Sequence, residues 1–239
     1  MIVIPMAGQS RRFAEAGYAL PKYMLPLHGR SVFAHAVGSF AGRIGSEPFL
    51  FIARDVAGTG EFIAAECRTL GIADARVALL DAPTAGQAVT VALGLRRADV
   101  ADAAPLTIFN IDTFRPGFRY PALPRSDGYL EVFRGGGASW SYVRPAPGAE
   151  PLALETAEKR PISDLCCTGL YHFARAADFH AALDAERQAP SAPELYVAPL
   201  YNHLIRRGAR IHWHLIAAEE VVFCGVPGEY AALLASPGG

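Results

Sequence analysis

Short apolar runs alternate with stretches of helical periodicity along the first half of the chain. The runs at residues 2–5, 49–53, 77–80 and 106–111 predict buried strands. Between them, apolar residues recur at i, i+3, i+4 and i+7 from Phe33 to Phe40 and from Ala88 to Leu95, which is the spacing of one helix face. Ser31 is placed to cap the first of these helices. Strands that alternate with helices predict a mainly parallel, doubly wound sheet.

From about residue 127 the apolar runs become shorter, and glycine and proline separate them. These runs predict strands at 129–133, 140–143, 152–155 and 168–173, with turns at 134–137 and 145–148. Helical periodicity returns at 176–188 and 193–207, and a strand at 210–216 and a short helix at 229–234 follow. We therefore expect a smaller antiparallel section in the second half. No linker divides the chain, so one domain over residues 1–239 is expected.

Composition and charge narrow the class of protein. With 239 residues, 51% of them hydrophobic, the chain is long enough to bury a full core. Its 22 basic and 23 acidic side chains nearly cancel, so net charge does not favour binding to nucleic acid or to a membrane surface. The sequence shows no signal-peptide pattern and no apolar run near the roughly 18 residues that span a bilayer, so we expect a cytoplasmic protein. The 4 cysteines form no CxxC pair and are expected to be reduced packing residues.

The loop after the first predicted strand has the composition of an anion site. Residues 7–10 (AGQS) are mostly small, which lets backbone N–H groups approach an anion closely, and Arg12 and Lys22 add positive charge. The dinucleotide fingerprint GxGxxG and the Walker A pattern GxxxxGK[ST] are both missing, which argues against NAD binding and against a P-loop ATPase. On these residues alone, a polyphosphate site and a glycine turn with solvated arginines both remain open.

Motifs spread over nearly the whole chain resemble those of the sugar-phosphate nucleotidyltransferases, in particular members that serve capsule and surface-polysaccharide synthesis. They are residues 5–8 (PMAG), 12–13 (RF), 20–27 (LPKYMLPL), 83–88 (PTAGQA), 110–112 (NID), 158–159 (EK), 168–173 (TGLYHF), 196–202 (YVAPLYN) and 225–230 (GVPGEY). The resemblance implies a Rossmann-like fold of the GT-A type. It further implies that residues 1–125 bind the nucleotide and residues 126–239 bind the acceptor.

The reaction that this resemblance implies is attack by a phosphate oxygen on the α-phosphate of a nucleoside triphosphate, with release of pyrophosphate. The acceptor is a sugar 1-phosphate or a similar phosphorylated metabolite. A phosphate monoester with a second pKa of about 6 is already an anionic nucleophile at pH 7, so positioning and charge neutralisation carry the catalysis without a dedicated base. By resemblance, the backbone of residues 7–10 holds the triphosphate, Arg12 stabilises the departing phosphates, and Lys22 bridges the α-phosphate and the incoming phosphate.

The remaining site residues also come from the resemblance. Asp112 follows a buried run and is expected to bind Mg²⁺, although a turn or cap aspartate fits the same position. The nucleobase is expected on Gly86 and Gln87, and the acceptor on Glu158, Lys159, Trp140 and Tyr196. Aromatic residues at such spacings are also common in cores. His212 and His214 share one strand face, but a third metal ligand is not evident.

The sequence departs from the family pattern at two positions. Ser10 stands where the loop normally has a second glycine, and we expect it to be tolerated there at a negative φ. Phe223 stands where many relatives carry a second metal-binding aspartate, and Glu219 and Glu220 lie ~10 to 13 Å upstream in an extended chain. The resemblance therefore implies Mg²⁺ held by Asp112, phosphates and water, with activity or metal dependence altered.

Two other functions stay open at this point. A degenerate homologue would bind nucleotide or sugar phosphate without turnover, and Phe223 is the residue that favours it. A glycosyltransferase of the GT-A type would need a D-x-D metal motif, of which residues 110–112 (NID) supply half. The product separates the three functions, because the transferase releases pyrophosphate, the binder releases nothing, and the glycosyltransferase releases a nucleoside diphosphate. The base, the acceptor and the oligomeric state are not readable from the sequence.

Overall fold

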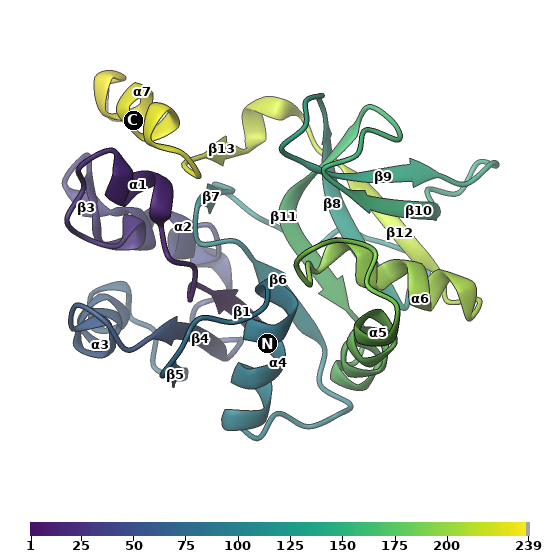
Figure 1. Ribbon diagram of the computed structural model, residues 1–239, viewed down its shortest axis with the longest axis horizontal. Helices are drawn as coiled ribbons and strands as arrows, with labels where there is room; N and C mark the ends of the chain where they lie inside the picture. Colours follow the sequence, from purple (N-terminus) through teal and green to yellow (C-terminus); the bar gives the residue numbers. More distant parts are fainter. Residues whose placement is uncertain (238–239) are drawn as a thin grey trace.

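A nine-stranded mixed sheet forms the centre of the computed structural model, which describes residues 1–237 (Figure 1). Along its main path the strand order is β10-β9-β11-β6-β1-β4-β5, and β8 pairs with both β11 and β12. The strands are β1 (Ile2–Pro5), β4 (Phe49–Arg54), β5 (Ala75–Leu80), β6 (Leu106–Phe109), β8 (Gly128–Arg134), β9 (Ser141–Pro145), β10 (Ala153–Glu158), β11 (Leu165–Phe173) and β12 (Ile211–Leu215).

The first half of the sheet is parallel and has a core on each face. β6, β1, β4 and β5 run in the same direction, with Ile2 opposite Phe49 in the register of β1 and β4. Ile2 and Ile4 of β1 pack against the side of α2 (Val32–Gly38) and α3 (Thr59–Leu70), whereas Val3 packs against the side of α4 (Gln87–Arg97). This alternation follows from the period of two along a strand. Because the strands run parallel, the carboxyl ends of β1, β4 and β5 lie at one edge of the sheet.

The second half is largely antiparallel, as expected. β11 joins the two halves, because it pairs antiparallel with β8 along one edge and with β6 and β9 along the other. Two short ribbons lie beside the main sheet, β7 (Thr113–Phe114) with β13 (Val222–Phe223) and β2 (Pro26–Leu27) with β3 (Arg30–Ser31). The other helices are α1 (Arg11–Glu15), α5 (Ala176–Gln188), α6 (Tyr201–Arg206), α7 (Pro227–Ala235), η1 (Lys22–Met24), η2 (Ala41–Arg43), η3 (Ala198–Leu200) and η4 (Ala218–Glu220).

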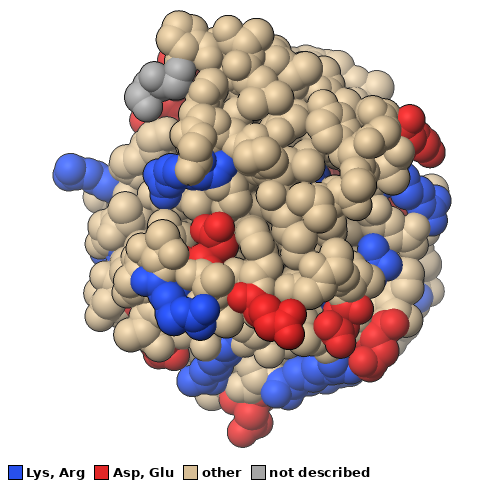
Figure 2. Space-filling view, turned by 90° about the vertical axis from the view of Figure 1, so that its left-hand side faces the viewer, with Lys and Arg blue, Asp and Glu red and all other residues tan. Residues whose placement is uncertain are grey.

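The mainly parallel sheet flanked by helices is confirmed, and so are most of the predicted elements. Ser31 caps α2 as expected, since its side-chain oxygen accepts a hydrogen bond from the N–H of Ala34 at 2.9 Å. All 4 cysteines are free and buried. None of the helices within residues 1–237 is long and apolar enough to cross a membrane. Basic and acidic side chains are interspersed over the face shown in Figure 2.

Two predicted elements are wrong in their extent. The helix expected over 193–207 begins only at η3 and α6, because the backbone of Leu195 instead bonds the turn before α4: its N–H donates to Ala85 and its carbonyl accepts from Ala88. The strand expected over 106–111 ends at Phe109. Asn110 opens a turn, because its carbonyl accepts a hydrogen bond from the N–H of Thr113 at 3.3 Å. Asp112 therefore lies in a turn just beyond the strand. Helix α3 has no counterpart among the predicted elements.

Candidate active site

One cleft of about 800 Å³ lies over the carboxyl ends of the parallel strands and reaches the antiparallel half. It gathers residues from distant parts of the chain. Every site residue that the sequence predicts lines it, namely Ala7, Gly8, Gln9, Ser10, Arg12, Lys22, Gly86, Gln87, Asp112, Trp140, Glu158, Lys159 and Tyr196. This is the position at which open α/β sheets bind ligands.

The loop from β1 to α1 enters the cleft in a tight conformation. Around Gly8 no atom lies within 4 Å of the place a Cβ would take, so the backbone there is open to a ligand. Ser10 has φ 50° and ψ 31°, which corrects the expectation of a negative φ at this serine. The left-handed conformation is the one that glycine adopts without a Cβ clash, and a non-glycine residue there costs roughly 1 to 2 kcal/mol. A glycine at this position would meet the same conformational demand without a Cβ.

Lys22 and Asp112 form an ion pair in the cleft. The Lys22 Nζ and Asp112 Oδ2 atoms are 2.5 Å apart, and the two side chains are only 19% and 22% exposed. Burial favours the neutral carboxyl, but the ammonium of Lys22, and with it the guanidinium of Arg12, outweighs burial, so the pKa of Asp112 lies below its ordinary value. The Asp112 carboxyl is therefore ionised at neutral pH, and it lies beside Lys22 in the cleft.

The ribbon of β7 and β13 fixes the chain on either side of Asp112. The Asp112 carbonyl accepts a hydrogen bond from Cys224 N–H at 2.8 Å, and Phe223 lies opposite Thr113 in the ribbon. Phe223 contributes an aromatic ring to the cleft, 4.6 Å from the ring centroid of Trp140. Glu220 is 3.1 Å from the guanidinium of Arg115 and does not line the cleft.

Glu229 is a cleft carboxylate that the sequence reasoning missed. A Cβ on Gly225 would lie 3.2 Å from Asp112 Oδ2 and 3.7 Å from Glu229 Oε2, so the two carboxylates flank this glycine. Glu229 Oε2 accepts hydrogen bonds from the N–H groups of Gly225 and Val226, at 2.7 and 3.2 Å, at the start of α7. Its spacing from Val226 is the signal of a capping residue, which gives no indication that the side chain also lines the cleft.

Gly86 and Gln87, where the sequence predicts the nucleobase, lie at the turn before α4. Gly86 has φ 134°, and a Cβ there would lie 2.5 Å from the carbonyl oxygen of Leu195. Gln87 begins the helix and donates a hydrogen bond from Nε2 to Asn110 Oδ1 at 2.6 Å. Gln87 is therefore tied to the turn that carries Asp112, rather than lying free on the surface.

Glu158, Lys159 and Tyr196, where the sequence predicts the acceptor, lie at the end of β10 and in the segment before η3. Lys159 Nζ donates to the Tyr196 hydroxyl at 2.6 Å and lies 4.7 Å from that ring's centroid, and this hydrogen bond raises the pKa of Lys159. Glu158 accepts a hydrogen bond from the Ser141 hydroxyl. Burial raises the pKa of Glu158, with Ser141 and Lys159 acting in the opposite direction. Glu158 and Lys159 therefore have separate partners at the same end of the cleft.

Other candidate ligands have structural roles. Tyr142 and Tyr201 are fully buried in the core and do not line the cleft. The buried imidazole of His212 is bonded to the Ser126 hydroxyl at 2.8 Å and to Glu150 at 2.9 Å. Among residues 1–237, no three His, Cys, Asp or Glu side chains are grouped to hold a metal. The donor set at Asp112 thus fits Mg²⁺, which takes one or two carboxylates with substrate phosphates and water.

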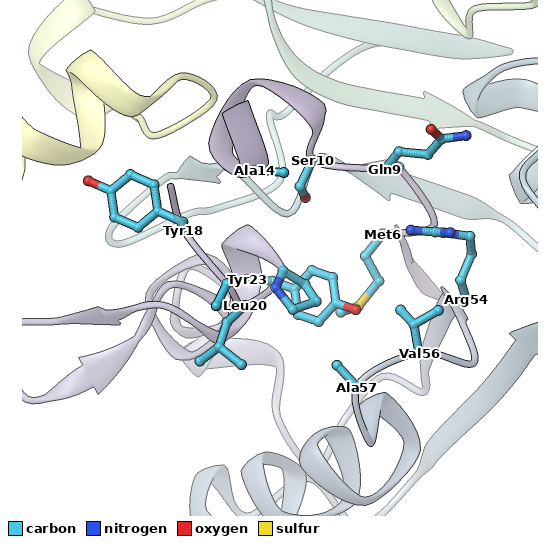
Figure 3. Close-up of a pocket in the computed structure, with 13 residues that line it drawn as sticks. Met6, Gln9, Ser10, Ala14, Tyr18, Leu20, Tyr23, Arg54, Val56 and Ala57 are labelled. Atoms are coloured by element: carbon cyan, nitrogen blue, oxygen red, sulfur yellow. The ribbon is translucent and has the colours of Figure 1, made fainter. Parts of the chain in front are cut away.

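A second hollow of about 220 Å³ borders the same loop (Figure 3). It is lined by residues of the segments 6–10, 14–23 and 54–57, most of them apolar. Arg54 reaches it from the end of β4, and the Nε atom of Arg54 is buried without a hydrogen-bond partner in the described part of the chain.

Solved structures with a similar sequence or a similar fold are known. No family model and no curated protein matches the chain. A solved nucleoside-diphosphate-sugar pyrophosphorylase from Vibrio cholerae RC9 is 51% identical to it, with a TM-score of 0.95 over 99% of this chain and 100% of that one. Two more distant solved structures share the fold. The inositol-1-phosphate CTP transferase from T. maritima is 11% identical, with a TM-score of 0.74 over 97% of this chain and 94% of that one. UDP-glucose pyrophosphorylase from Acinetobacter baumanii is 14% identical, with a TM-score of 0.71 over 98% of this chain and 91% of that one.

Proposed function

Because the chain belongs to the family of nucleoside-diphosphate-sugar pyrophosphorylases, the sugar-phosphate nucleotidyltransferases, we propose that it activates a phosphorylated metabolite with a nucleoside triphosphate. The acceptor is a sugar 1-phosphate or a similar phosphorylated small molecule. The observation that carries the proposal is the Lys22–Asp112 pair, placed in one cleft between the small-residue loop of β1 and the Lys159 side chain.

The transfer is a single displacement at phosphorus. A phosphate oxygen of the acceptor forms a bond to the α-phosphorus, the bond from that phosphorus to the bridging oxygen breaks, and pyrophosphate leaves with the electron pair. The acceptor phosphate is already ionised near pH 7, so no residue has to remove a proton. Lys22 neutralises the α-phosphate and the incoming phosphate, and Arg12 neutralises the departing phosphates. Such preorganised charges typically contribute ~10² to 10³ in rate each.

The substrates are held from opposite halves of the chain. Backbone N–H groups of residues 7–10 bind the triphosphate, and the turn at Gly86 and Gln87 receives the base. Residues 1–125 thus form the nucleotide part, and residues 126–239 form the acceptor part, in which Glu158 and Lys159 bind the acceptor between Trp140 and Tyr196. All of these residues line the same cleft, which supports the assignment.

Mg²⁺ is the metal that this site suits. Asp112 would hold it, with phosphate oxygens and water completing the shell. The ion supplies charge neutralisation at the phosphates. Lys22 keeps Asp112 ionised before substrates bind. Because Lys22 and a metal would compete for the same carboxylate, the Lys22 ammonium then moves to the phosphates.

The first experiment measures pyrophosphate release with Mg²⁺, crossing CTP, UTP, dTTP, ATP and GTP against sugar 1-phosphates, phosphocholine and related metabolites. Release with one pair establishes the reaction, the base and the acceptor. We place the product in capsular or surface-polysaccharide synthesis in the cytoplasm. Nucleotide binding by calorimetry without release would support the degenerate binder that Phe223 favours, and release of a nucleoside diphosphate would support a glycosyltransferase.

A further inference from the structure

The acceptor end of the cleft is rich in carboxylates and has a single cation. Among the described cleft residues after position 125, Lys159 is the one lysine or arginine, whereas Glu158, Glu194 and Glu229 are acidic. Glu229 lies beside Gly225 and Asp112 and is engaged by backbone N–H groups at the start of α7, which leaves Glu158 and Glu194 as the other carboxylates. An acceptor phosphate brings about −1.5 to −2 charge into this end near pH 7. Lys22 and Lys159 are placed to offset the phosphate, and a positive group on the acceptor would offset the carboxylates.

Aromatic rings form one wall of the same cleft. The ring centroids of Trp140 and Phe223 are 4.6 Å apart, and Phe133 packs against them at 5.1 and 5.2 Å respectively. Trp140 and Phe223 are half-buried and line the cleft, whereas Phe133 lies behind them. The faces of such rings attract cations, with about 0.5 to 2 kcal/mol per contact. The wall therefore suits a cationic group as well as an apolar face.

Glu158 is the carboxylate best placed to meet that group. It is half-buried on β10, and Ser141 lies directly across from it as its partner in the β9–β10 register and its hydrogen-bond donor, whereas Trp140 bonds the N–H of the next residue, Lys159, through its carbonyl. No ion pair involves Glu158 within residues 1–237, because the neighbouring Lys159 ammonium is directed to Tyr196 instead. Burial raises the pKa of Glu158, which shows that its surroundings do not fully compensate the charge. A ligand cation would complete this arrangement.

We propose that the acceptor carries an amine or a quaternary ammonium group in addition to its phosphate, and that this group binds between Glu158 and the Trp140–Phe223 wall. The inference rests on the proposed nucleotidyl transfer. Lys22 and Lys159 hold the phosphate, and the ammonium neutralises the carboxylate end of the cleft. A neutral sugar phosphate leaves that end uncompensated and is the poorer acceptor.

The test uses pairs of acceptors that differ in the positive charge. Phosphocholine is paired with 3,3-dimethylbutyl phosphate, its uncharged isostere, and glucosamine 1-phosphate with glucose 1-phosphate. We expect at least about a tenfold higher kcat/KM for the ammonium member of a pair, which corresponds to about 1.4 kcal/mol. Trp140→Leu and Glu158→Gln should each reduce this ratio towards one. Glu155→Gln is the matched control on β10, because Glu155 pairs with Arg144 and Arg160 outside the cleft, and it should keep the ratio.

The outcomes separate this inference from the function on which it rests. Equal or better turnover of the uncharged members would support nucleotidyl transfer and overturn the ammonium inference. Absence of pyrophosphate with every nucleotide and acceptor would contradict the proposed function. In that case calorimetry compares phosphocholine with its isostere on the full chain, and equal affinities would overturn the ammonium inference as well.

Discussion

Lys22 and Asp112 are residues whose removal tests chemistry rather than folding. Lys22→Met keeps the apolar stem and removes the charge, and Asp112→Asn keeps the shape of the side chain. We expect each variant to lose at least about 10² in kcat, since each removes a charge that acts on the phosphates. Pyrophosphate release gives the rate, and circular dichroism shows whether the fold persists. Arg97→Met is the control, because Arg97 pairs with Asp81 on the surface. Collapse of the fold in either site variant would make the pair structural.

Ser10 provides a second test at the same scale, because its φ of 50° is a conformation that glycine adopts more readily. Ser10→Gly should leave the free energy of unfolding unchanged or raise it by up to about 1 kcal/mol, as relief of strain is partly offset by a more flexible unfolded chain. Ser10→Val should lower it by about 1 kcal/mol or more and weaken triphosphate binding. Urea unfolding and nucleotide calorimetry measure both effects. Ser46→Gly, at an exposed position without positive φ, should bring no gain, and a gain there equal to that of Ser10→Gly would refute the strain.

At the scale of elements, the turn before α4 and the segment before η3 act as one unit. Leu195 exchanges backbone hydrogen bonds with Ala85 and Ala88, at 3.0 and 2.9 Å, and the adjacent Tyr196 holds Lys159. The turn at Gly86 and the segment that carries Tyr196 are therefore joined by main-chain hydrogen bonds. A distortion of one should reach the other.

Gly86→Ala tests this connection. A Cβ at φ 134° would lie 2.5 Å from the Leu195 carbonyl oxygen, so we expect the substitution to cost about 2 kcal/mol of stability and to raise KM for both substrates. Gly42→Ala is the control, because no atom lies within 4 Å of its Cβ position and its φ is not positive. Steady-state kinetics with each substrate varied in turn provides the measurement. A change in the nucleotide KM alone would show that the two sides are independent.

The same elements show how far sequence reasoning reaches. Periodicity predicts β1, α2 and α5 closely, because each depends on local spacing and caps. The expected helix over 193–207 starts late because backbone bonds from Leu195 to a turn more than 100 residues away override local preference. The predicted cleft residues are assigned from motif resemblance, whereas Glu229, although it lies in the motif 225–230, receives no role, since its spacing indicates only a cap. The left-handed φ of Ser10 was equally invisible, as only the closed loop imposes it.

At the scale of the whole molecule, His172 lies on β11 where the parallel and antiparallel halves join. Its Nδ1 is 3.1 Å from the Thr107 hydroxyl of β6, and its ring stacks on Tyr129 of β8 at 5.1 Å. Burial lowers the pKa of His172 to about 4. The folded protein thus keeps this imidazole neutral in a pH range where the unfolded chain, with a histidine pKa of about 6.5, takes up a proton.

The sign of the resulting pH dependence follows from proton uptake. Where the unfolded state binds more protons, the free energy of unfolding falls as pH falls, so the contribution of His172 is complete above pH 6.5 and is lost between pH 6.5 and about 4. The loss amounts to about 3 kcal/mol at roughly 1.4 kcal/mol per pH unit. His172→Phe keeps an aromatic ring against Tyr129 and removes the titration. The free energy of unfolding of both proteins is measured in urea from pH 7 to 4, and that of the wild type should fall more steeply with pH than that of His172→Phe. If both free energies fall in parallel, groups other than His172 cause the acid sensitivity.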